Sequence, residues 1–196
     1  MTNNEITSIV LVGVGGQGIL LASEITAQAA MAAGYDVKTN EVHGMAQRGG
    51  SVIAQIRYGK KVNSPLVEMG KARVLCSLEQ IEALRFQEYL APDGLAVVNT
   101  QIMIPVTVST GAAVYPDNAY DRLKETFGRL VYLDAVSLAK ELGNVKAANV
   151  ILLGAMSKNL NIPEESWHTA IEKSVKPQFT ELNKKAFQKG REQSHA

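Results

Sequence analysis

The feature that most constrains the fold is a glycine-rich hexapeptide, Gly-Val-Gly-Gly-Gln-Gly, at residues 13–18. It follows a short apolar run, Ser8–Val12, which is typical of a strand buried on both faces. An alanine-rich stretch comes next, Ile19–Ala33, with apolar residues at helical spacing and Gly34 where a C-terminal cap belongs. Tyr35–Glu41 predicts a second strand. Together these segments predict a β-α-β unit with the glycines at the start of its helix.

Later segments predict the rest of the sheet and a helical end. The expected strands are Ser51–Tyr58, Ala72–Cys76 and Leu95–Asn99, and weaker strand patterns lie at Thr107–Thr110 and Leu130–Leu133. The expected helices are Glu79–Leu90, Pro116–Phe127, Ala147–Leu160, one after Pro163 and one after a break at Pro177. We therefore expect residues 1–196 to form a single α/β domain. It should have three layers, a Rossmann-like, mostly parallel sheet and a helical C-terminal third.

The composition is that of an ordinary globular protein and excludes several function classes. Of the 196 residues, 46% are hydrophobic, and 20 basic residues nearly balance 19 acidic ones. A net charge of +1 gives no support to a broad electrostatic surface for nucleic acid. The single cysteine, Cys76, excludes an internal disulfide, a cysteine-ligated iron–sulfur cluster and a multi-cysteine zinc site. Because no signal peptide or membrane-length apolar run is visible, we expect a cytoplasmic protein without membrane contact.

The glycine cluster fits the pattern G-x-G-x-x-G through Gly13, Gly15 and Gly18. The first glycine allows a tight turn, the second lets a ligand approach the backbone, and the third lets helix and strand pack closely. Unpaired N–H groups at the start of a helix can hold a phosphate or another anion. We expect an anion-binding or subunit-contact turn that includes Gly16, with Gln17 as a possible side-chain donor. A tight turn that binds nothing is the alternative.

A dinucleotide site would also need an acidic residue at the end of the second strand, to bind a ribose. Asp36 lies 18 residues after Gly18 but at the start of that strand. Glu41 lies 23 residues after Gly18 and is better placed, at the end of the strand. Either carboxylate fits the usual spacing of about 20 residues only marginally.

A second cluster of polar residues follows the second strand. It contains His43, Gln47, Arg48, Gly49 and Gly50 within eight residues. A loop that leaves the carboxyl end of a strand lies where open α/β sheets bind ligands. Histidine can transfer protons near neutral pH, and arginine can bind a carboxylate or phosphate through two parallel hydrogen bonds. A solvated loop whose glycines only turn the chain is the alternative.

Other signatures of catalysis are missing from the sequence. No P-loop lysine follows the glycine cluster, no nucleophile elbow is visible, and no two histidines lie at metal-ligand spacing. Cys76 ends a buried apolar run and predicts a structural thiol. Asn149 lies in an apolar helix and would need hydrogen-bond partners if buried, so we expect it to contact a loop. The chain is therefore not expected to bind a metal or to perform chemistry alone.

Together the motifs resemble the gamma subunit, or gamma domain, of 2-oxoacid:ferredoxin oxidoreductases. The glycine turn with its alanine-rich helix carries one part of the resemblance, and Arg-Gly-Gly-Ser at residues 48–51 carries another. The longer run at residues 41–50, Glu-Val-His-Gly-Met-Ala-Gln-Arg-Gly-Gly, is similar to the version in the beta subunit of indolepyruvate ferredoxin oxidoreductases. The stretch from Leu142 through Asn149 to Ala155 resembles the late helix of the same family.

The resemblance implies a reaction performed by a complex. In this family the complete enzyme oxidatively decarboxylates a 2-oxoacid, forms an acyl-coenzyme A and reduces ferredoxin. Thiamine diphosphate, Mg²⁺ and iron–sulfur clusters lie on partner subunits, and coenzyme A is a co-substrate of the complex. This chain is therefore expected to bind no cofactor alone. Its expected partners are the subunits that carry these groups, with ferredoxin as the electron acceptor of the complex.

We therefore predict a required subunit that is inactive alone and supplies elements next to the active centre. The loop with His43, Gln47 and Arg48 would face the active centre or the partner chain, and it favours indolepyruvate or another aryl or small 2-oxoacid. Arg48→Ala is expected to lower the activity of the complex while this chain stays folded. Two other classes stay open: a free-standing NAD(P)-dependent oxidoreductase that uses the glycine turn, and a non-catalytic interaction module.

Overall fold

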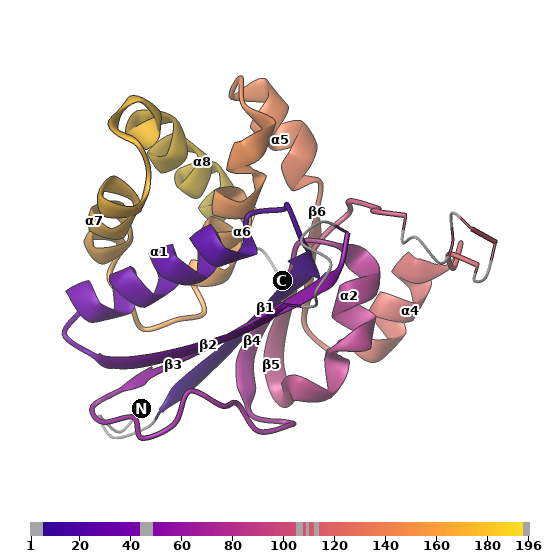
Figure 1. The fold of residues 1–196 in the computed structure, drawn as a ribbon, viewed down its shortest axis with the longest axis horizontal. Coiled ribbons are helices and arrows are strands. Elements are labelled where there is room, and N and C mark those ends of the chain that lie inside the picture. The colour runs from indigo at the N-terminus through magenta and orange to yellow at the C-terminus, as the bar shows by residue number, and fades with distance from the viewer. Residues whose placement is uncertain (1–5, 44–48, 105–107, 109, 112–113, 194–196) are drawn as a thin grey trace.

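The computed structural model describes residues 6–43, 49–104, 108, 110–111 and 114–193. At its centre is a six-stranded sheet with the order β2-β3-β1-β4-β5-β6 (Figure 1). The strands are β1 (Thr7–Val14), β2 (Asp36–His43), β3 (Ser51–Gly59), β4 (Ala72–Ser77), β5 (Leu90–Asn99) and β6 (Leu130–Leu133). The pairs β1–β4, β4–β5 and β5–β6 are parallel, whereas β3 runs antiparallel to both β1 and β2. Most pairings of the described strands are thus parallel, and the predicted α/β class is confirmed.

The two strands of the predicted β-α-β unit are not neighbours in the sheet. β1, α1 (Ile19–Ala32) and β2 follow one another along the chain, but β3 lies between β1 and β2 in the sheet. β2 pairs with β3 along its length, and its side chains are mostly exposed. Such an edge strand lacks the continuous apolar run of a strand buried on both faces. The end of β2 therefore lies two strand spacings, about 10 Å, from β1.

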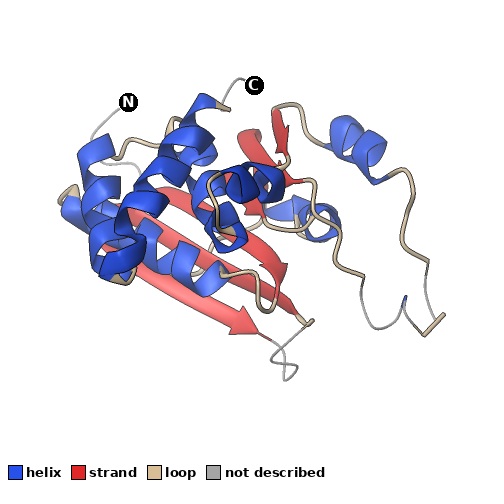
Figure 2. Cartoon of the chain, turned by 90° about the horizontal axis from the view of Figure 1, so that it is seen from above, coloured by secondary structure: helices blue, strands red, loops and turns tan. Residues whose placement is uncertain are grey.

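Helices cover both faces of the sheet and form two outer layers (Figure 1). One layer contains α1, α5 (Ala135–Glu141), α6 (Ala148–Ser157), α7 (Glu164–Ser174) and α8 (Thr180–Glu192), and the other contains α2 (Gln80–Arg85) and α4 (Ala119–Thr126). Short 3₁₀ helices are η1 (Gln87–Tyr89), η2 (Val145–Ala147) and η3 (Pro177–Phe179). Figure 2 looks onto the larger layer and shows the strands passing behind it. The expected three layers and helical C-terminal third are both present.

Several predicted boundaries shift by a few residues. The helix expected over Glu79–Leu90 ends at Arg85 and continues as the 3₁₀ turn η1. The helix expected from Pro116 starts at Ala119. Of the strand candidate at Thr107–Thr110, only residues 108 and 110 are described, and neither is in a strand. The proline signals hold: Pro163 immediately precedes α7, and Pro177 opens η3 and separates α7 from α8.

The two faces of β1 explain its unbroken apolar run. Ile9 and Leu11 pack beneath the larger helical layer, and Val10 and Val12 pack beneath α2 and α4. All four side chains are fully buried. Alternate residues of a strand point to opposite faces, so a strand covered on both sides needs apolar residues at every position.

Within the larger layer, α6 and α8 approach so closely that their backbones touch. A Cβ atom on Gly154 would lie 2.0 Å from the Phe187 carbonyl oxygen, and one on Gly190 would lie 1.8 Å from the Ile151 carbonyl oxygen. No side chain fits at either position. Trp167 of α7 stacks on Phe187 with ring centroids 5.4 Å apart, which fixes the third helix of this group.

No helix in the described part of the chain has both the length and the apolar character needed to cross a bilayer.

Candidate functional site

The two sequence motifs meet at the carboxyl edge of the sheet. The turn at residues 13–18 leaves β1, and Gly49 and Gly50 lead into β3 next to it. The Gly15 N–H donates to the Gly50 carbonyl over 2.8 Å, and the Gly49 N–H donates to the Gly15 carbonyl over 3.4 Å. These bonds extend the β1–β3 ladder by one step beyond the pair Val14–Ser51. The two glycine elements therefore form one backbone surface.

Gly18 links this surface to α1. Its φ of +82° lies in the left-handed region that favours glycine, and it occupies the N-cap position of α1. No side chain caps the helix there, and its first turn contains no acidic residue. An added Cβ would also lie 2.6 Å from Nδ2 of Asn149. Backbone conformation and lack of space thus both require glycine at this position.

The side chain of Gln17 is bound inside the protein. Its Oε1 accepts from the Val14 N–H over 2.8 Å, and its Nε2 donates to the Leu78 carbonyl and to Oε1 of Gln101, each over 2.9 Å. Both amide hydrogens therefore have protein acceptors. Gln17 therefore joins the ends of β1 and β4 to the segment after β5. Because its amide hydrogens are already used, the donors for an anion at this turn would be backbone N–H groups.

Asn149 holds the same turn from the helical side. Its side chain is 4% exposed, its Nδ2 donates to the Gly18 carbonyl over 3.1 Å, and its Oδ1 accepts from the Val150 N–H over 2.8 Å. The amide of a buried asparagine is thus bonded on both sides. The contact connects α6 to the glycine turn across 131 residues of sequence.

The polar loop is described only at its two ends. His43 ends β2 with an exposed side chain, opposite Val52 of β3. Gly49 and Gly50 form the contact with Gly15 given above. Gln47 and Arg48 lie outside the described residues.

Nearly the whole of this chain matches a known protein family. The family model for pyruvate ferredoxin/flavodoxin oxidoreductase matches residues 8–193. The chain belongs to this family. It is a subunit of an oxidoreductase complex of the 2-oxoacid:ferredoxin class.

Individual relatives support the same assignment. The chain is 45% identical over 188 residues to indolepyruvate oxidoreductase subunit IorB of Thermococcus kodakarensis, with 93% of each chain covered. It is 41% identical over 191 residues to the IorB subunit of Archaeoglobus fulgidus, with 95% of this chain and 94% of that one covered. The gamma subunit of keto/oxoacid ferredoxin oxidoreductase from Geobacter sulfurreducens has a similar structure, with a TM-score of 0.70 and 25% identity over 96% of this chain and 98% of that one. The predicted family and fold are confirmed.

Sequence reasoning missed Glu79, the residue that anchors the end of β4 beside the glycine turn. Glu79 follows β4 and is 2% exposed. Its Oε2 accepts from the N–H groups of Ile81 and Glu82, over 2.7 and 3.0 Å. Its Oε1 accepts from the Tyr115 hydroxyl over 2.6 Å and the Met103 N–H over 3.3 Å. The available signal was an acidic residue at the start of a helix, which is a common N-cap.

Asn99, at the end of β5, was missed in the same way. It is 1% exposed, its Nδ2 donates to the Leu78 carbonyl over 3.2 Å, and its Oδ1 accepts from the Ala135 N–H over 3.1 Å. The Leu78 carbonyl therefore accepts from both Gln17 and Asn99. A chain of hydrogen-bonded amides thus joins the carboxyl ends of β1, β4 and β5.

Burial shifts the pKa values of two ionisable groups at this edge. Burial raises the pKa of Glu82, while its hydrogen bond from the Ser51 hydroxyl and the nearby Arg85 act in the opposite direction. Burial also raises the pKa of Tyr115, and its hydrogen bond to Glu79 adds to the increase. Because Ser51 directly follows Gly50, the Glu82 carboxyl group holds the glycine pair against α2.

The acidic residues considered for a dinucleotide ribose lie away from the turn. Asp36 is at the opposite end of β2, where it accepts from Lys38 and from the Val62 N–H. A hydrogen bond from Lys38 lowers the pKa of Asp36. Glu41 pairs with Ala54 on the edge strand, and its side chain is exposed. Because β3 separates β2 from β1, neither carboxylate lies on a strand next to the glycine turn.

Cys76 has the structural role that the sequence predicts. Its side chain is fully buried in β4, and burial raises the pKa of its thiol to about 12. A thiol in this state is protonated at neutral pH and is a poor nucleophile.

Proposed function

We propose that this chain is the accessory subunit of an indolepyruvate-type 2-oxoacid:ferredoxin oxidoreductase, and that its carboxyl sheet edge faces the catalytic subunit. The observation that carries the proposal is the backbone pairing of Gly15 with Gly50, which merges the glycine turn and the glycine pair before β3 into one surface. The 45% identity to a curated IorB subunit over nearly the whole chain supports the substrate class. The proposed substrate is therefore indolepyruvate or another aryl 2-oxoacid.

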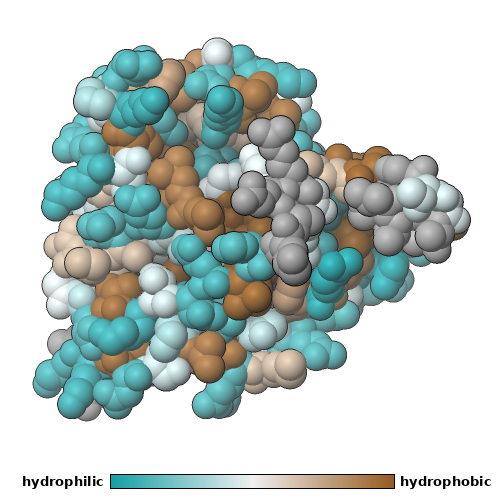
Figure 3. Space-filling model, in the orientation of Figure 1, coloured by the Kyte–Doolittle hydropathy of each residue, from teal (hydrophilic) through white to brown (hydrophobic). Residues whose placement is uncertain are grey.

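Exposed apolar side chains around this edge support its role as a subunit interface. Their exposed fractions are 50% for Leu20, 53% for Val42, 52% for Ile102, 55% for Ile104 and 49% for Val145. Leu20, Val42 and Val145 belong to elements that start or end at the carboxyl edge, and Ile102 and Ile104 follow the end of β5. Figure 3 shows hydrophobic side chains reaching the surface around the start of α1. Large apolar residues exposed together on a soluble protein mark an interaction site.

The chain's own residues supply positioning in this proposal. Gln17, Asn99 and Asn149 are bonded inside the protein, so they hold the backbone surface in one conformation before a partner arrives. Such preorganisation lowers the entropy lost on binding. Thiamine diphosphate with Mg²⁺, iron–sulfur clusters and coenzyme A would serve the complex through partner subunits, with ferredoxin as electron acceptor. The single, buried cysteine of this chain is consistent with clusters held elsewhere.

Assembly can be tested with two variants on one helix. Leu20 lies at the carboxyl-edge end of α1, and Met31, 55% exposed, lies at the other end. The tagged chain is co-produced with its large partner subunit, and the recovered complex is quantified by size-exclusion chromatography. We expect Leu20→Asp to weaken assembly at least tenfold and Met31→Asp to leave it unchanged. Equal assembly of both variants would exclude this face as the interface.

Activity of the assembled complex tests the remaining part of the proposal. Reduction of ferredoxin is followed with indolepyruvate, phenylpyruvate, pyruvate and 2-oxoglutarate as separate substrates, and the isolated chain is assayed in parallel. We expect turnover with the aryl substrates, none by the isolated chain, and a lower rate in an assembled His43→Ala complex, because His43 is exposed beside the joined backbone surface. A preference for pyruvate or 2-oxoglutarate would contradict the substrate class, and an unchanged rate in His43→Ala would contradict the role of the loop.

A further inference from the structure

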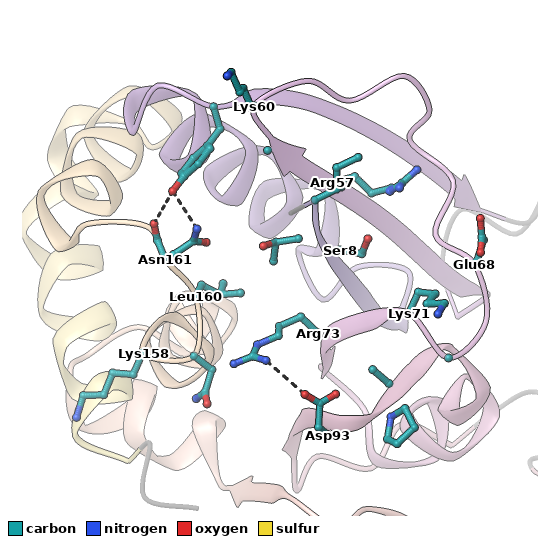
Figure 4. Close-up of a pocket in the computed structure, with 18 residues that line it drawn as sticks. Ser8, Arg57, Lys60, Glu68, Lys71, Arg73, Asp93, Lys158, Leu160 and Asn161 are labelled. Carbon is teal, nitrogen blue, oxygen red and sulfur yellow. Dashed lines mark hydrogen bonds and ion pairs between the residues drawn. The ribbon is translucent and has the colours of Figure 1, made fainter. Parts of the chain in front are cut away.

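A second concave surface lies at the opposite, amino edge of the sheet (Figure 4). The groove has a volume of about 710 Å³ and is lined by the starts of β1 and β4, the end of β3 and the segment between α6 and α7. β1 spans eight residues between this edge and the glycine turn, which separates the two surfaces by roughly 25 Å. The groove is therefore distinct from the surface assigned above.

The groove is strongly basic in a chain that is nearly neutral. Its lining contains five basic residues and two acidic ones, whereas the whole chain has a net charge of +1. The charged residues are Arg57, Lys60, Lys71, Arg73, Lys158, Glu68 and Asp93. Figure 4 shows Arg73 reaching into the groove, while Lys60 and Lys158 point outward at its rim. The positive potential is thus concentrated in one recess.

Two arginines lie at this edge, on the strands on either side of β1. Ser8 of β1 lies opposite Arg57 of β3, and Arg73 directly precedes Val74 of β4, which pairs with Ile9. Their guanidinium groups point away from each other, that of Arg57 toward the segment after β3 and that of Arg73 toward Asp93 (Figure 4). Arg73 is therefore the arginine that a ligand in the groove can reach.

Neutral groups of the chain hold the Arg57 side chain. Its Nη1 donates to the carbonyls of Ser64 and Leu66 over 2.9 and 3.2 Å. Its Nε is enclosed and has no hydrogen-bond acceptor. Carbonyl groups carry no net charge, so these contacts do not neutralise the guanidinium.

The other cations are available for an incoming anion. Arg73 pairs with Asp93 at 3.6 Å, but the Asp93 side chain is 81% exposed, so this bridge is weak and exchangeable. Within the described part of the chain, Lys60, Lys71 and Lys158 form no ion pair. The groove therefore contains more positive charge than the protein itself neutralises.

We propose that this groove binds a small molecule that carries at least two phosphate groups. Arginine is the side chain best suited to planar, bidentate recognition of phosphate, and the excess of basic over acidic residues around Arg73 matches a ligand of several negative charges. The volume lies within the usual range of about 300–1,000 Å³ for small-molecule sites. An acidic peptide would instead require an extended basic track, whereas these cations line one recess.

Calorimetric titration of the full chain with pyrophosphate at low ionic strength tests the proposal. We expect binding that Arg73→Gln weakens at least tenfold. The matched control is Arg122→Gln, which removes the same charge from an exposed position on α4 and should change the Kd less than twofold. Arg73 is preferred to Arg57 because Arg57 also holds two carbonyls of the chain. Absence of binding at millimolar pyrophosphate, or equal weakening by both variants, would overturn the proposal.

Backbone amide shifts in a ¹H–¹⁵N spectrum locate the bound anion and test its class. We expect shifts at Ser8, Gly59 and Gly70, and none at Gly15 or Gly16. Shifts confined to the glycine turn would overturn the proposal, and so would an aspartate-rich peptide that binds the groove when pyrophosphate does not. Tripolyphosphate and ATP are compared last: equal affinities indicate recognition of the phosphates alone, and tighter binding of ATP indicates a nucleotide.

Discussion

The two edges of the sheet use polar residues in opposite ways. At the carboxyl edge, Gln17, Glu79, Asn99 and Asn149 are buried or half-buried and bonded to the protein, and the surface that they support is backbone. At the amino edge, the backbone is ordinary strand, and the surface consists of basic side chains that the protein leaves mostly unneutralised.

This difference has a consequence for stability. Buried polar groups that lose their partners are destabilising, because each unsatisfied donor or acceptor costs about 1–3 kcal/mol. Exposed charges contribute little to folding, typically less than about 1 kcal/mol per pair. Substitutions at the carboxyl edge should therefore change stability, and those at the amino edge should change ligand binding with the fold intact.

The largest effect is expected for Glu79→Ala. The substitution removes the acceptor of four hydrogen bonds, including two at the N-terminus of α2. We expect the free energy of unfolding to fall by about 3–5 kcal/mol, measured by urea denaturation. Glu125→Ala on the exposed face of α4 is the control and should change it by less than about 0.5 kcal/mol. Similar losses in the two variants would show that the carboxyl edge is not held by its polar network.

Gln17→Ala should have the next largest effect. It leaves the Val14 N–H and the Leu78 carbonyl with fewer partners, and we expect a loss of about 2–4 kcal/mol in the same assay. Gln28→Ala, at a half-buried position of α1, is the matched control and should cost less than about 1 kcal/mol. A Gln17→Ala variant as stable as the parent would assign this side chain to ligand or partner binding.

Alanine substitutions at two glycines of the turn distinguish the cost of backbone strain from the cost of a steric clash. Gly16 has a φ of +103° with open space where a Cβ atom would lie, whereas Gly18 has a φ of +82° and Asn149 only 2.6 Å from that position. We expect Gly16→Ala to cost about 1 kcal/mol and Gly18→Ala about 2–3 kcal/mol. In an Asn149→Ala background the difference between the two should shrink, because the steric conflict is gone. A difference that persists in that background would mean that Asn149 does not set the space at Gly18.

The pH dependence of stability tests the link between Glu82 and Ser51. Burial raises the pKa of Glu82 in the folded chain above the ordinary value of 4.5, so the folded state binds the proton more tightly than the unfolded state. Stability should therefore fall as pH rises from about 4.5 through the raised pKa. Glu82→Gln can still accept from Ser51 and should flatten this part of the curve. An unchanged slope in Glu82→Gln would assign the pH dependence to another group.

The smallest effect on stability is expected at the amino edge. Arg73→Gln should change the free energy of unfolding by less than about 0.5 kcal/mol, because its ion pair with Asp93 is exposed. Thermal and urea denaturation of this variant should match those of Arg122→Gln. A loss above 2 kcal/mol would show that Arg73 is part of the fold and would remove the contrast between the two edges.

The sequence predicts the layers of this fold well, since they follow from hydrophobic patterns. The pattern at Leu130–Leu133 predicts a strand with the observed bounds, and the prolines at 163 and 177 mark real helix boundaries. The strand order is harder to predict. Nothing local to Asp36–His43 says that it pairs with the next strand along the chain instead of with β1, because pairing depends on contacts between distant segments.

Part of the site can be predicted from the sequence, because some of its residues form local patterns. Glycines at fixed spacing after a strand can be recognised in a sequence, and Asn149 is a polar residue among apolar ones. Glu79 gives a weaker signal because two of its partners, Met103 and Tyr115, come from an irregular segment. The basic groove gives none, since Arg57, Arg73 and Lys158 are far apart along the chain and converge only when it is folded.

The close crossing of α6 and α8 has a consequence for the order in which the chain can fold. The glycine turn is synthesised early, but its support by Asn149 belongs to α6, and α6 is seated through Gly154 and Gly190 against the last helix. Contacts of such large sequence separation form late, because a long loop must close before they contribute. As the chain leaves the ribosome, its glycine motif therefore stays unfinished until α8 has been added. Removing α8 should consequently disturb the turn at residues 13–18, far from it in sequence.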